Sequence, residues 1–399
     1  MANTTLNPDA LTIMLVAGEA SGDAHGAELI NALRRRKADL RFIGCGGPRM
    51  AAAGQEQLFD LTRHAVVGLT EAISHYFTFR QLFFKLVTLA QMQKPDAVIF
   101  IDNSGFNLRL AQALRPKLPD SRLIYYISPQ VWASRAGRVK VMKRTLDLVL
   151  SIFPFETEWY EKNAPGLPVH YVGHPKLDLL LPDALGQTEE GRIALMPGSR
   201  TVEIKRHLPV LWEAARLMAE RKPNLKFMLI SPNAEREREA VEWIERYGRT
   251  GFHYETCHNY QLTHLNRCQL ALVKSGTGSL DCAFARVPQI VLYKVNPLTF
   301  AVARRLVKVK YLSMVNVLSK NPPIVPEFIQ QDCTGPKIAA FALELLDHPK
   351  MRKHMIDQMT EVIASLGGEG ASDRAAREVC LELTKVARGQ SHSAHLKPA

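Results

Sequence analysis

The sequence contains few cysteines, no long apolar run and no repeat of fixed period. Its six cysteines are scattered, and none belongs to a Cys-x-x-Cys pair. This distribution argues against a disulfide framework and a zinc site, and it favours a reducing cytoplasm. No apolar stretch approaches the roughly 18–20 residues that cross a bilayer. The first stretch, Leu11–Ala17, follows no positive charge and stops at Gly18-Glu19, so it predicts a strand and not a signal peptide.

Several ligand-binding signatures are missing as well. The glycine-rich loops do not match the Gly-x-Gly-x-x-Gly pattern of dinucleotide-binding proteins, and no Gly-Lys-Ser/Thr follows them as in a Walker A loop. No two aspartates are two residues apart, so the chain lacks an Asp-x-Asp pair for a metal-bridged sugar nucleotide. We therefore expect chemistry that needs neither a metal nor a cofactor.

Basic residues outnumber acidic ones, and the formal net charge is +12. They cluster in residues 34–37, 135–144 and 304–310. A phosphate-bearing substrate, an anionic membrane surface or a nucleic acid would each explain such a surface. No nucleic-acid-binding module is recognisable, so we expect no nucleic-acid partner. Solvated helix faces are the simplest alternative.

The 399 residues suit two domains. Short β-rich runs alternate with helical patterns, which is typical of parallel, doubly wound sheets. We predict two Rossmann-like α/β domains facing a central cleft, at 1–173 and 174–349, with helices from about residue 350 packing back on the first domain. Predicted strands are 11–17, 40–43, 97–101, 122–127, 146–151, 169–172, 192–196, 226–230, 251–254, 270–273 and 289–292.

Three glycine-containing loops follow predicted strands, at residues 18–23, 197–200 and 275–281. A strand that ends in such a turn and opens a helix exposes backbone N–H groups at the positive end of the helix dipole, which suits phosphate or carboxylate. Arg200 adds a guanidinium, and Asp281 adds a carboxylate that accepts ribose hydroxyls. The loops at 197–200 and 275–281 together predict a nucleotide-diphosphate site in the second half of the chain.

Asp102 is the sharpest candidate for acid–base chemistry. It follows the apolar run Ala97–Ile101, at the end of a predicted strand where ligands bind in open α/β sheets. We interpret it as a general base, with the N-cap of the next helix as the alternative. His174 precedes Pro175 at the predicted domain junction, where it either binds ligand or shapes the hinge.

Residues 75–87 carry more apolar side chains than a core-facing helix requires. We expect this segment to enter the headgroup region of a membrane with its aromatic rings, beside two cations. Burial between the sheet and a neighbouring helix is the alternative. The predicted membrane contacts are Tyr76, Phe77, Phe79, Arg80, Phe83, Phe84 and Lys85.

An ordered set of motifs covers nearly the whole chain, from Leu15 to about Leu383. Its members are Val16–Asp23, Gly47–Met50, Ile101-Asp102 with Phe106-Asn107, Tyr126–Ala133, Phe153–Glu156, Gly173–Pro175, Pro197–Arg200 and Ser275–Thr277. In these motifs the sequence resembles the lipid-A-disaccharide synthase family, which are glycosyltransferases of the two-domain GT-B type. So many coincident loops are far more specific than any one of them.

The resemblance implies an inverting transfer of 2,3-diacylglucosamine from UDP to 2,3-diacylglucosamine 1-phosphate. The products are a β-1,6 disaccharide of the Gram-negative lipid A pathway and UDP. It also implies a peripheral enzyme at the cytoplasmic side of the inner membrane, with Asp102 as the base. The acceptor-binding residues would be Glu19, Ser21, Gly22, Asp23 and Asn107. The nucleotide-binding residues would be Gly198, Ser199, Arg200, Ser275, Gly276, Thr277, Gly278, Ser279, Asp281 and Asn316.

The sequence departs from the family at three places. Asp281 replaces a usual Glu, Asn103-Ser104-Gly105 replace Ala-Pro-Asp or a close relative, and Ser134 replaces a second tryptophan. These changes bear on acyl-chain preference and donor geometry more than on the reaction class.

Other functions fit a GT-B chain: N-acetylglucosamine transfer to another lipid, a UDP-N-acetylglucosamine 2-epimerase, or an inactive membrane-docked nucleotide-sugar-binding protein. An epimerase would have no use for the aromatic segment, and the presence of Asp102 and Arg200 argues against an inactive protein. The oligomeric state stays open, a homodimer included.

Overall fold

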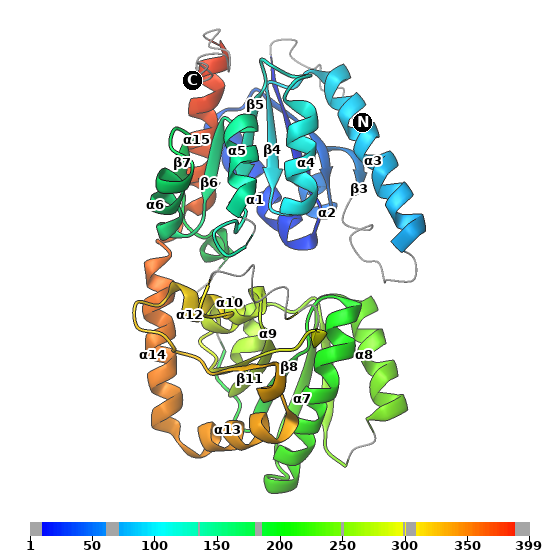
Figure 1. The fold of residues 1–399 in the computed structure, drawn as a ribbon, viewed down its shortest axis with the longest axis vertical. Coiled ribbons are helices and arrows are strands. Elements are labelled where there is room, and N and C mark those ends of the chain that lie inside the picture. The colour runs from blue at the N-terminus through cyan, green and yellow to red at the C-terminus, as the bar shows by residue number, and fades with distance from the viewer. Residues whose placement is uncertain are drawn as a thin grey trace. The chain divides into compact units, whose positions relative to one another are not determined.

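The computed structural model describes residues 10–60, 72–134, 136–179, 186–248, 251–297, 300 and 309–387. The chain forms two compact units (Figure 1). Unit 1 comprises Met1–Leu179 and Leu366–Ala399, and unit 2 comprises Leu180–Ser365.

Unit 1 is built on a parallel sheet of seven strands in the order β3-β2-β1-β4-β5-β6-β7. The central strands are continuous apolar runs that are buried along most of their length, as expected for a sheet covered on both faces. The strands are β1 (Leu11–Ala17), β2 (Leu40–Gly46), β3 (Glu56–Asp60), β4 (Ala97–Ile101), β5 (Arg122–Tyr126), β6 (Leu148–Ser151) and β7 (Val169–Tyr171).

Helices cover this sheet on both sides (Figure 1). One core cluster joins the sheet to α3 (Ala72–Gln93), α4 (Ser104–Leu114), α5 (Val139–Thr145) and α6 (Pro154–Asn163). The chain also forms α1 (Ala20–Arg36), α2 (Pro48–Ala52), α15 (Ala371–Ala387) and two 3-10 turns, η3 (Ala136–Arg138) and η4 (Pro175–Leu179).

Unit 2 repeats the plan with six parallel strands in the order β10-β9-β8-β11-β12-β13. Its strands are β8 (Arg192–Met196), β9 (Lys226–Ser231), β10 (Tyr254–His258), β11 (Leu270–Lys274), β12 (Gln289–Tyr293) and β13 (Glu327–Ile329). Its helices are α7 (Thr201–Arg221), α8 (Ala234–Tyr247), α9 (Leu262–Asn266), α10 (Thr277–Phe284), α12 (Met314–Leu318), the 3-10 turn η6 (Gln330–Asp332), α13 (Gly335–Asp347) and α14 (Pro349–Ser365).

The predicted central strands are confirmed, and the differences fall at the sheet edges. The predicted strand at 251–254 is wrong, since β10 starts at Tyr254. β3 and β13 were not predicted, because neither carries a continuous apolar run. All three are outermost strands of their sheets. An outer strand needs less apolar surface, so its sequence signal is weaker.

The two units begin and end at other residues than the predicted domains, which were 1–173 and 174–349 with the helices from about residue 350 on the first domain. The 3-10 turn η4 goes with unit 1, and α14 stays in unit 2. Of the two last helices, only α15 packs on unit 1, against α1 and β5.

One partly buried contact fixes the start of α15. The Asp178 carboxylate accepts the backbone N–H groups of Gly370 and Ala371 at 2.7 and 3.0 Å and that of Ser372 at 2.8 Å. Arg374 adds a hydrogen bond from Nε to the Val172 carbonyl at 2.7 Å. A carboxylate at a helix N-terminus satisfies orphan N–H groups and interacts favourably with the dipole.

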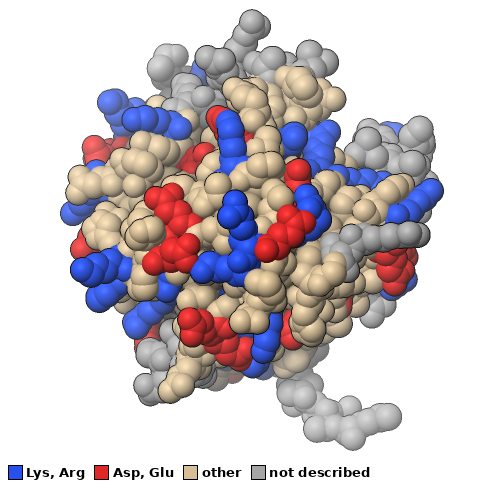
Figure 2. All heavy atoms as spheres, turned by 90° about the horizontal axis from the view of Figure 1, so that it is seen from below, with Lys and Arg blue, Asp and Glu red and all other residues tan. Residues whose placement is uncertain are grey.

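The basic excess is not gathered into one continuous patch on the face drawn in Figure 2, where Lys and Arg side chains are interspersed with Asp and Glu. Many of the surface cations are paired, as Arg35 is with Asp373 at 3.1 Å. This face therefore presents no continuous positive potential to an anionic partner.

We predict that Asp178→Ala loosens α15 without unfolding the sheet. Removing a helix cap typically costs about 1 kcal/mol and up to about 2 kcal/mol, so exchange protection of the amides in α15 should fall roughly 5- to 30-fold. Hydrogen exchange with mass spectrometry measures it. Asp373→Ala is the control, because it removes a carboxylate from the same helix whose ion pair is exposed and contributes little. Equal protection in both variants would contradict the capping role.

Candidate active site

The strand order reverses between β1 and β4, and the loops after these strands meet at that point. Ala17 pairs with Ile101 at the last register position, so Gly18-Glu19 and Asp102 leave the sheet side by side. Ligands of doubly wound sheets bind at such a switch point, outside the carboxyl ends of the strands. A Cβ at Gly18 would lie 2.4 Å from Nδ2 of Asn103, so a larger residue there would displace the Asn103 side chain.

Asp102 lies in a constrained turn. Both Asp102 and Asn103 have positive φ, at 48° and 41°. Residues other than glycine adopt this region at a cost of roughly 1–3 kcal/mol, and only where the surroundings hold them. The Asp102 carbonyl accepts from the Tyr125 hydroxyl and, at 2.9 Å, from Nδ2 of Asn107. The backbone of this residue is therefore fixed from the core side.

The electrostatic surroundings raise the pKa of the Asp102 carboxyl to about 6. Burial is the largest cause, and the nearby Glu19 carboxylate acts in the same direction, while the Asn103 backbone N–H opposes them. The N-cap of α4 is Asn103 and not Asp102. Asp102 is thus a poised carboxyl beside a second one, which suits proton transfer near neutral pH.

Two of the five predicted acceptor-binding residues are internal ties. Asp23 is buried and accepts the backbone N–H groups of Gly47, Arg49 and Met50 at 2.8, 3.0 and 2.9 Å. Asn107 is buried and donates to the Ile101 and Asp102 carbonyls at 3.1 and 2.9 Å. Both side chains hold the loops that carry the candidate site, and their predicted contact with the acceptor stays a prediction.

The other three acceptor predictions divide by exposure. Glu19 and Ser21 are exposed at the start of α1. Gly22 is buried, and a Cβ there would lie 3.3 Å from the Ala17 Cβ. Gly22 therefore serves the close packing of α1 on the strands.

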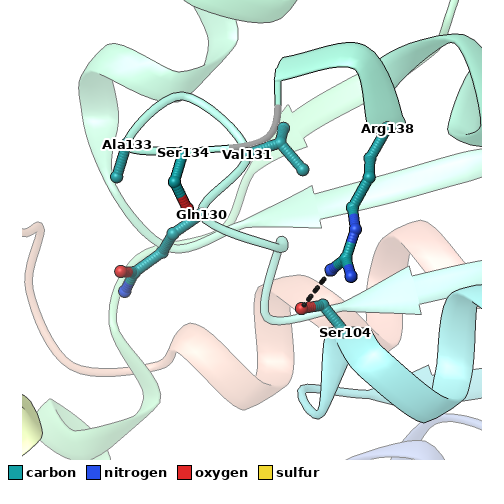
Figure 3. A pocket seen from close by; sticks show the side chains of 6 residues that line it. All are labelled: Ser104, Gln130, Val131, Ala133, Ser134 and Arg138. Carbon is teal, nitrogen blue, oxygen red and sulfur yellow. Dashed lines mark hydrogen bonds between the residues drawn. The ribbon is translucent and has the colours of Figure 1, made fainter. Parts of the chain in front are cut away.

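A pocket of about 290 Å³ opens beside the turn at Asp102-Asn103 (Figure 3). Arg138 donates to Ser104 Oγ at 3.3 Å across it. Its lining residues are Ser104, Gln130, Val131, Ala133, Ser134 and Arg138. Ser134, which stands where the resembling family usually carries tryptophan, is one of them.

The buried Glu156 side chain holds the loop that lines this pocket at residues 130–134. This buried carboxyl accepts from Nε1 of Trp132 at 2.9 Å and from the Ile152 and Phe153 backbone N–H groups at 3.2 Å. Burial raises the pKa of Glu156 to about 7, against these hydrogen bonds. The sequence marked both residues as motif members but gave them no role.

His174 is buried in unit 1, and its Nδ1 accepts the Lys176 backbone N–H at 3.2 Å. Burial, followed by the charges of His25 and Lys176, lowers the pKa of His174 to about 3. A neutral ring that accepts from the following turn favours a role in shaping this segment.

Unit 2 has its own switch point, between β8 and β11, where Met196 pairs with Val273. The loops that follow carry Gly198 and Gly276 at positive φ, 127° and 147°. A Cβ at Gly198 would lie 2.6 Å from Oε2 of Glu203. Glycine is needed at both positions because side chains rarely adopt these positive φ values.

A cluster of charged side chains joins the two loops. The Nζ of Lys274 lies 2.8 Å from Oε1 of Glu203, and the Ser199 backbone N–H donates to Oε2 at 2.9 Å. Burial would raise the pKa of Glu203, but Lys274 and these hydrogen bonds lower it. Arg200, whose side chain is 76% exposed, lies 4.0 Å from the same carboxylate. Lys274 was not predicted from the sequence, because a single lysine at the end of a strand belongs to no recognisable motif.

Behind this cluster lies His207. It is buried, with Nδ1 at 2.8 Å from the Glu203 carbonyl, and its Nε2 accepts the Lys294 backbone N–H at 3.0 Å. Burial and the charge of Lys274 lower the pKa of His207 to about 4. The ring is therefore neutral and holds α7 to the end of β12.

Several predicted nucleotide-binding side chains are already bonded inside unit 2. Asn316 is buried; Nδ2 donates to the Val325 carbonyl at 2.9 Å and to Glu327 at 2.8 Å, and Oδ1 accepts the Ile324 and Val325 N–H groups. These hydrogen bonds saturate its amide, and its predicted contact with the nucleotide stays a prediction. Ser275 and Ser279 bond to Leu312 and Ser313 at 2.8 Å.

Asp281 is buried in α10 and accepts the Tyr260 hydroxyl at 2.5 Å. Its predicted ribose contact stays a prediction. The atoms that the loops leave accessible belong to the exposed Ser199, Arg200 and Thr277 and to the half-buried Gly198, Gly276 and Gly278.

The predicted membrane segment has two kinds of described side chain. Phe83 packs partly buried against the core, with its ring 5.8 Å from that of Phe106, and its predicted membrane contact stays a prediction. Phe84 is 55% exposed, with the Arg80 guanidinium 5.7 Å from its ring. Lys85 is exposed over the Phe59 ring. The side chains of Tyr76, Phe77 and Phe79 lie outside the described residues.

Among the described residues, no group of three or more His, Cys, Asp or Glu side chains could hold a metal ion. Within the same parts of the chain, no helix has the length and apolar character of a transmembrane span.

Comparison with solved structures defines the class: the two doubly wound units form a GT-B fold. A Staphylococcus aureus structure titled as an MnaA–UDP co-structure superposes with a TM-score of 0.64, covering 98% of this chain and 99% of the other at 14% identity. The calicheamicin glycosyltransferase CalG4 gives a TM-score of 0.56 over 94% and 99% of the two chains, also at 14% identity. At such identities the likeness shows the fold alone.

The sequence comparisons identify the family. A family model described as lipid-A-disaccharide synthetase matches residues 13–379. The lipid-A-disaccharide synthase of Trichlorobacter lovleyi is 37% identical over 375 residues, 91% of this chain and 95% of that protein. The chain belongs to the lipid-A-disaccharide synthase family of glycosyltransferases.

Proposed function

We propose that this protein transfers 2,3-diacylglucosamine from its UDP derivative to 2,3-diacylglucosamine 1-phosphate and so forms a β-1,6-linked disaccharide and UDP. The family membership supports the reaction class. The structural observation that carries the proposal is the poised Asp102 carboxyl at the unit 1 switch point, beside Glu19. The alternatives gain no comparable support, because the structures titled as epimerases share only the fold, at 11–13% identity.

The displacement needs a group that takes the proton of the acceptor 6-hydroxyl as it attacks the anomeric carbon. Asp102 fits this role, since burial and Glu19 give its carboxyl a pKa near that of an efficient general base. The constrained backbone turn keeps the carboxyl in one position before the substrate arrives. Preorganised groups of this kind avoid a reorganisation cost during the reaction.

The departing UDP needs positive charge at its diphosphate. Arg200, Lys274 and the backbone N–H groups of the two glycine loops supply it in unit 2. Lys274 is held by Glu203, so its ammonium stays beside the loop in the free protein. Arg200 is exposed and can form a bidentate contact with the diphosphate. This arrangement is consistent with metal-independent transfer.

We further propose that the protein acts at the surface of the cytoplasmic membrane, where both acylated substrates lie. The exposed ring of Phe84 beneath Arg80 supports this proposal. An aromatic ring with an adjacent cation suits the headgroup region of anionic lipid.

The reaction is tested by UDP release from detergent-solubilised donor and acceptor. Asp102→Asn should lower turnover by about 10²- to 10⁴-fold, the usual scale for a lost general base, with UDP affinity unchanged. In the wild type, kcat/KM should fall as the pH drops through about 6, because the base is active only as the carboxylate.

The same assay tests the coupling to Glu19. Glu19→Gln removes the like charge, which lowers the pKa of Asp102, so the acidic limb should move to lower pH. The limb position is the readout, since Glu19 also belongs to the predicted acceptor side. Full turnover in Asp102→Asn, or an acidic limb that stays in place in Glu19→Gln, would assign the base elsewhere.

UDP affinity tests the donor site. Arg200→Ala and Lys274→Ala should each weaken UDP binding by roughly 10- to 100-fold, the range of a lost charge-assisted hydrogen bond. Isothermal titration calorimetry measures it. Arg216→Ala is the control, because it removes an exposed cation from the same helix, α7, where it pairs with Glu220. If both site variants bind UDP as the control does, the diphosphate binds elsewhere.

Vesicle co-sedimentation tests the membrane proposal. Phe84→Ser should weaken binding to anionic vesicles roughly 5- to 10-fold, since burying about half a phenylalanine ring contributes on the order of 1 kcal/mol. Tyr247→Ser is matched to it: Tyr247 is also an exposed ring, 62% accessible, with Arg246 beside it, but it lies in unit 2. Equal binding by both variants would refute the role of α3. Phe83→Ser should instead lower the melting temperature, because that ring packs on the core.

A further inference from the structure

The pocket in unit 1 has the chemistry of an oxyanion site. Of its lining side chains, Arg138 carries a positive charge, Ser104 and Ser134 carry hydroxyls and Gln130 carries an amide. None of the six lining residues is acidic. Arginine with hydroxyl and amide donors is the usual set for phosphate recognition. Figure 3 shows Arg138 and Ser104 directed toward each other across the opening, joined by their hydrogen bond.

The position of the pocket relates it to the proposed base. Ser104 is two residues beyond Asp102, at the start of α4. The Tyr125 hydroxyl feels the charges of both Asp102 and Arg138. Burial raises the pKa of Tyr125 well above the ordinary value, the Asp102 charge raises it further, and the Arg138 charge lowers it. Asp102 and Arg138 therefore lie within electrostatic range of one hydroxyl group.

The acceptor sugar has a matching layout. Its attacking 6-hydroxyl is on C6, which is attached to ring carbon C5, and its phosphate is on ring carbon C1. C5 and C1 are the two carbons bonded to the ring oxygen. A sugar that offers its 6-hydroxyl to Asp102 must place its phosphate within one ring width of that carboxylate. A cationic pocket beside Asp102 meets this requirement.

We propose that this pocket binds the anomeric phosphate of the acceptor, with Arg138 as its principal ligand and Ser104 as a second donor. The assignment rests on the proposed function and names the group that distinguishes acceptor from donor. The two sugars differ at C1, where one carries a phosphate monoester and the other a nucleoside diphosphate. The loop that forms the pocket is anchored through Trp132 to the buried Glu156, so the site is preformed.

The test compares two acceptors: diacylglucosamine 1-phosphate and the same lipid without its phosphate. In the wild type, kcat/KM should favour the phosphorylated acceptor. Arg138→Ala should reduce this preference by roughly 10- to 100-fold, and Arg138→Lys should restore part of it, because a point charge lacks the guanidinium fork. Ser104→Ala should reduce it by roughly 2- to 10-fold and serves as the second variant if Arg138→Ala folds poorly. The control is Lys140→Ala, an exposed cation two residues further along in α5.

The outcomes separate the two proposals. A preference that is unchanged in Arg138→Ala, or activity lost equally with both acceptors, overturns the phosphate assignment while the reaction stands. The same loss in Lys140→Ala also overturns it, because the effect would then be general attraction. If the wild type releases no UDP with either acceptor, the proposed function itself fails.

Discussion

The reversal of strand order in each sheet is the constraint on which the rest of the structure depends. In unit 1 it falls between β1 and β4, and in unit 2 between β8 and β11. Because all strands are parallel, helices on either side of the reversal diverge, and the loops between them are free to carry ligand-binding groups. Glu19 and Asp102 leave unit 1 at this point, and the Gly198 and Gly276 loops leave unit 2 at the corresponding one.

The two switch points are charged in opposite senses. At the first, two carboxyls lie close enough that burial and mutual repulsion raise the pKa of Asp102 to about 6. At the second, Lys274 and Arg200 surround a carboxylate whose pKa is lowered, against burial, by the neighbouring cation. A base that gains a proton and cations that receive a leaving diphosphate are what a displacement of UDP requires. The fold supplies the same scaffold twice, and the side chains differentiate it.

Sequence patterns predicted the fold class and the central strands, since buried parallel strands are continuous apolar runs. The outermost strands β3, β10 and β13 were missed or misplaced because their residues are half polar. For the site, glycine turns after strands located the loops correctly, but residue type could not separate a ligand contact from an internal tie. Asp23, Asn107 and Asn316 look like ligands in sequence, yet each is buried and bonded to backbone. Arg138 and Lys274 were missed for the opposite reason: only the packing shows which basic side chains lie beside the loops.

These internal ties explain how polar motifs far apart in the chain contribute to one site. Asp23 holds the start of α2, Asn107 and Tyr125 hold the carbonyl of Asp102, and Glu156 holds Trp132 under the pocket loop. Each lies a step behind a group that would meet substrate. A buried donor or acceptor that loses its partner destabilises the folded state, so these hydrogen bonds restrict the loops to one arrangement. They let Asp102 occupy a backbone conformation that an unsupported turn would not keep. The Asp102 turn is thus stabilised by residues whose hydrogen-bonding groups are used inside the protein, and replacing any of them would act on substrate only through the loop it holds.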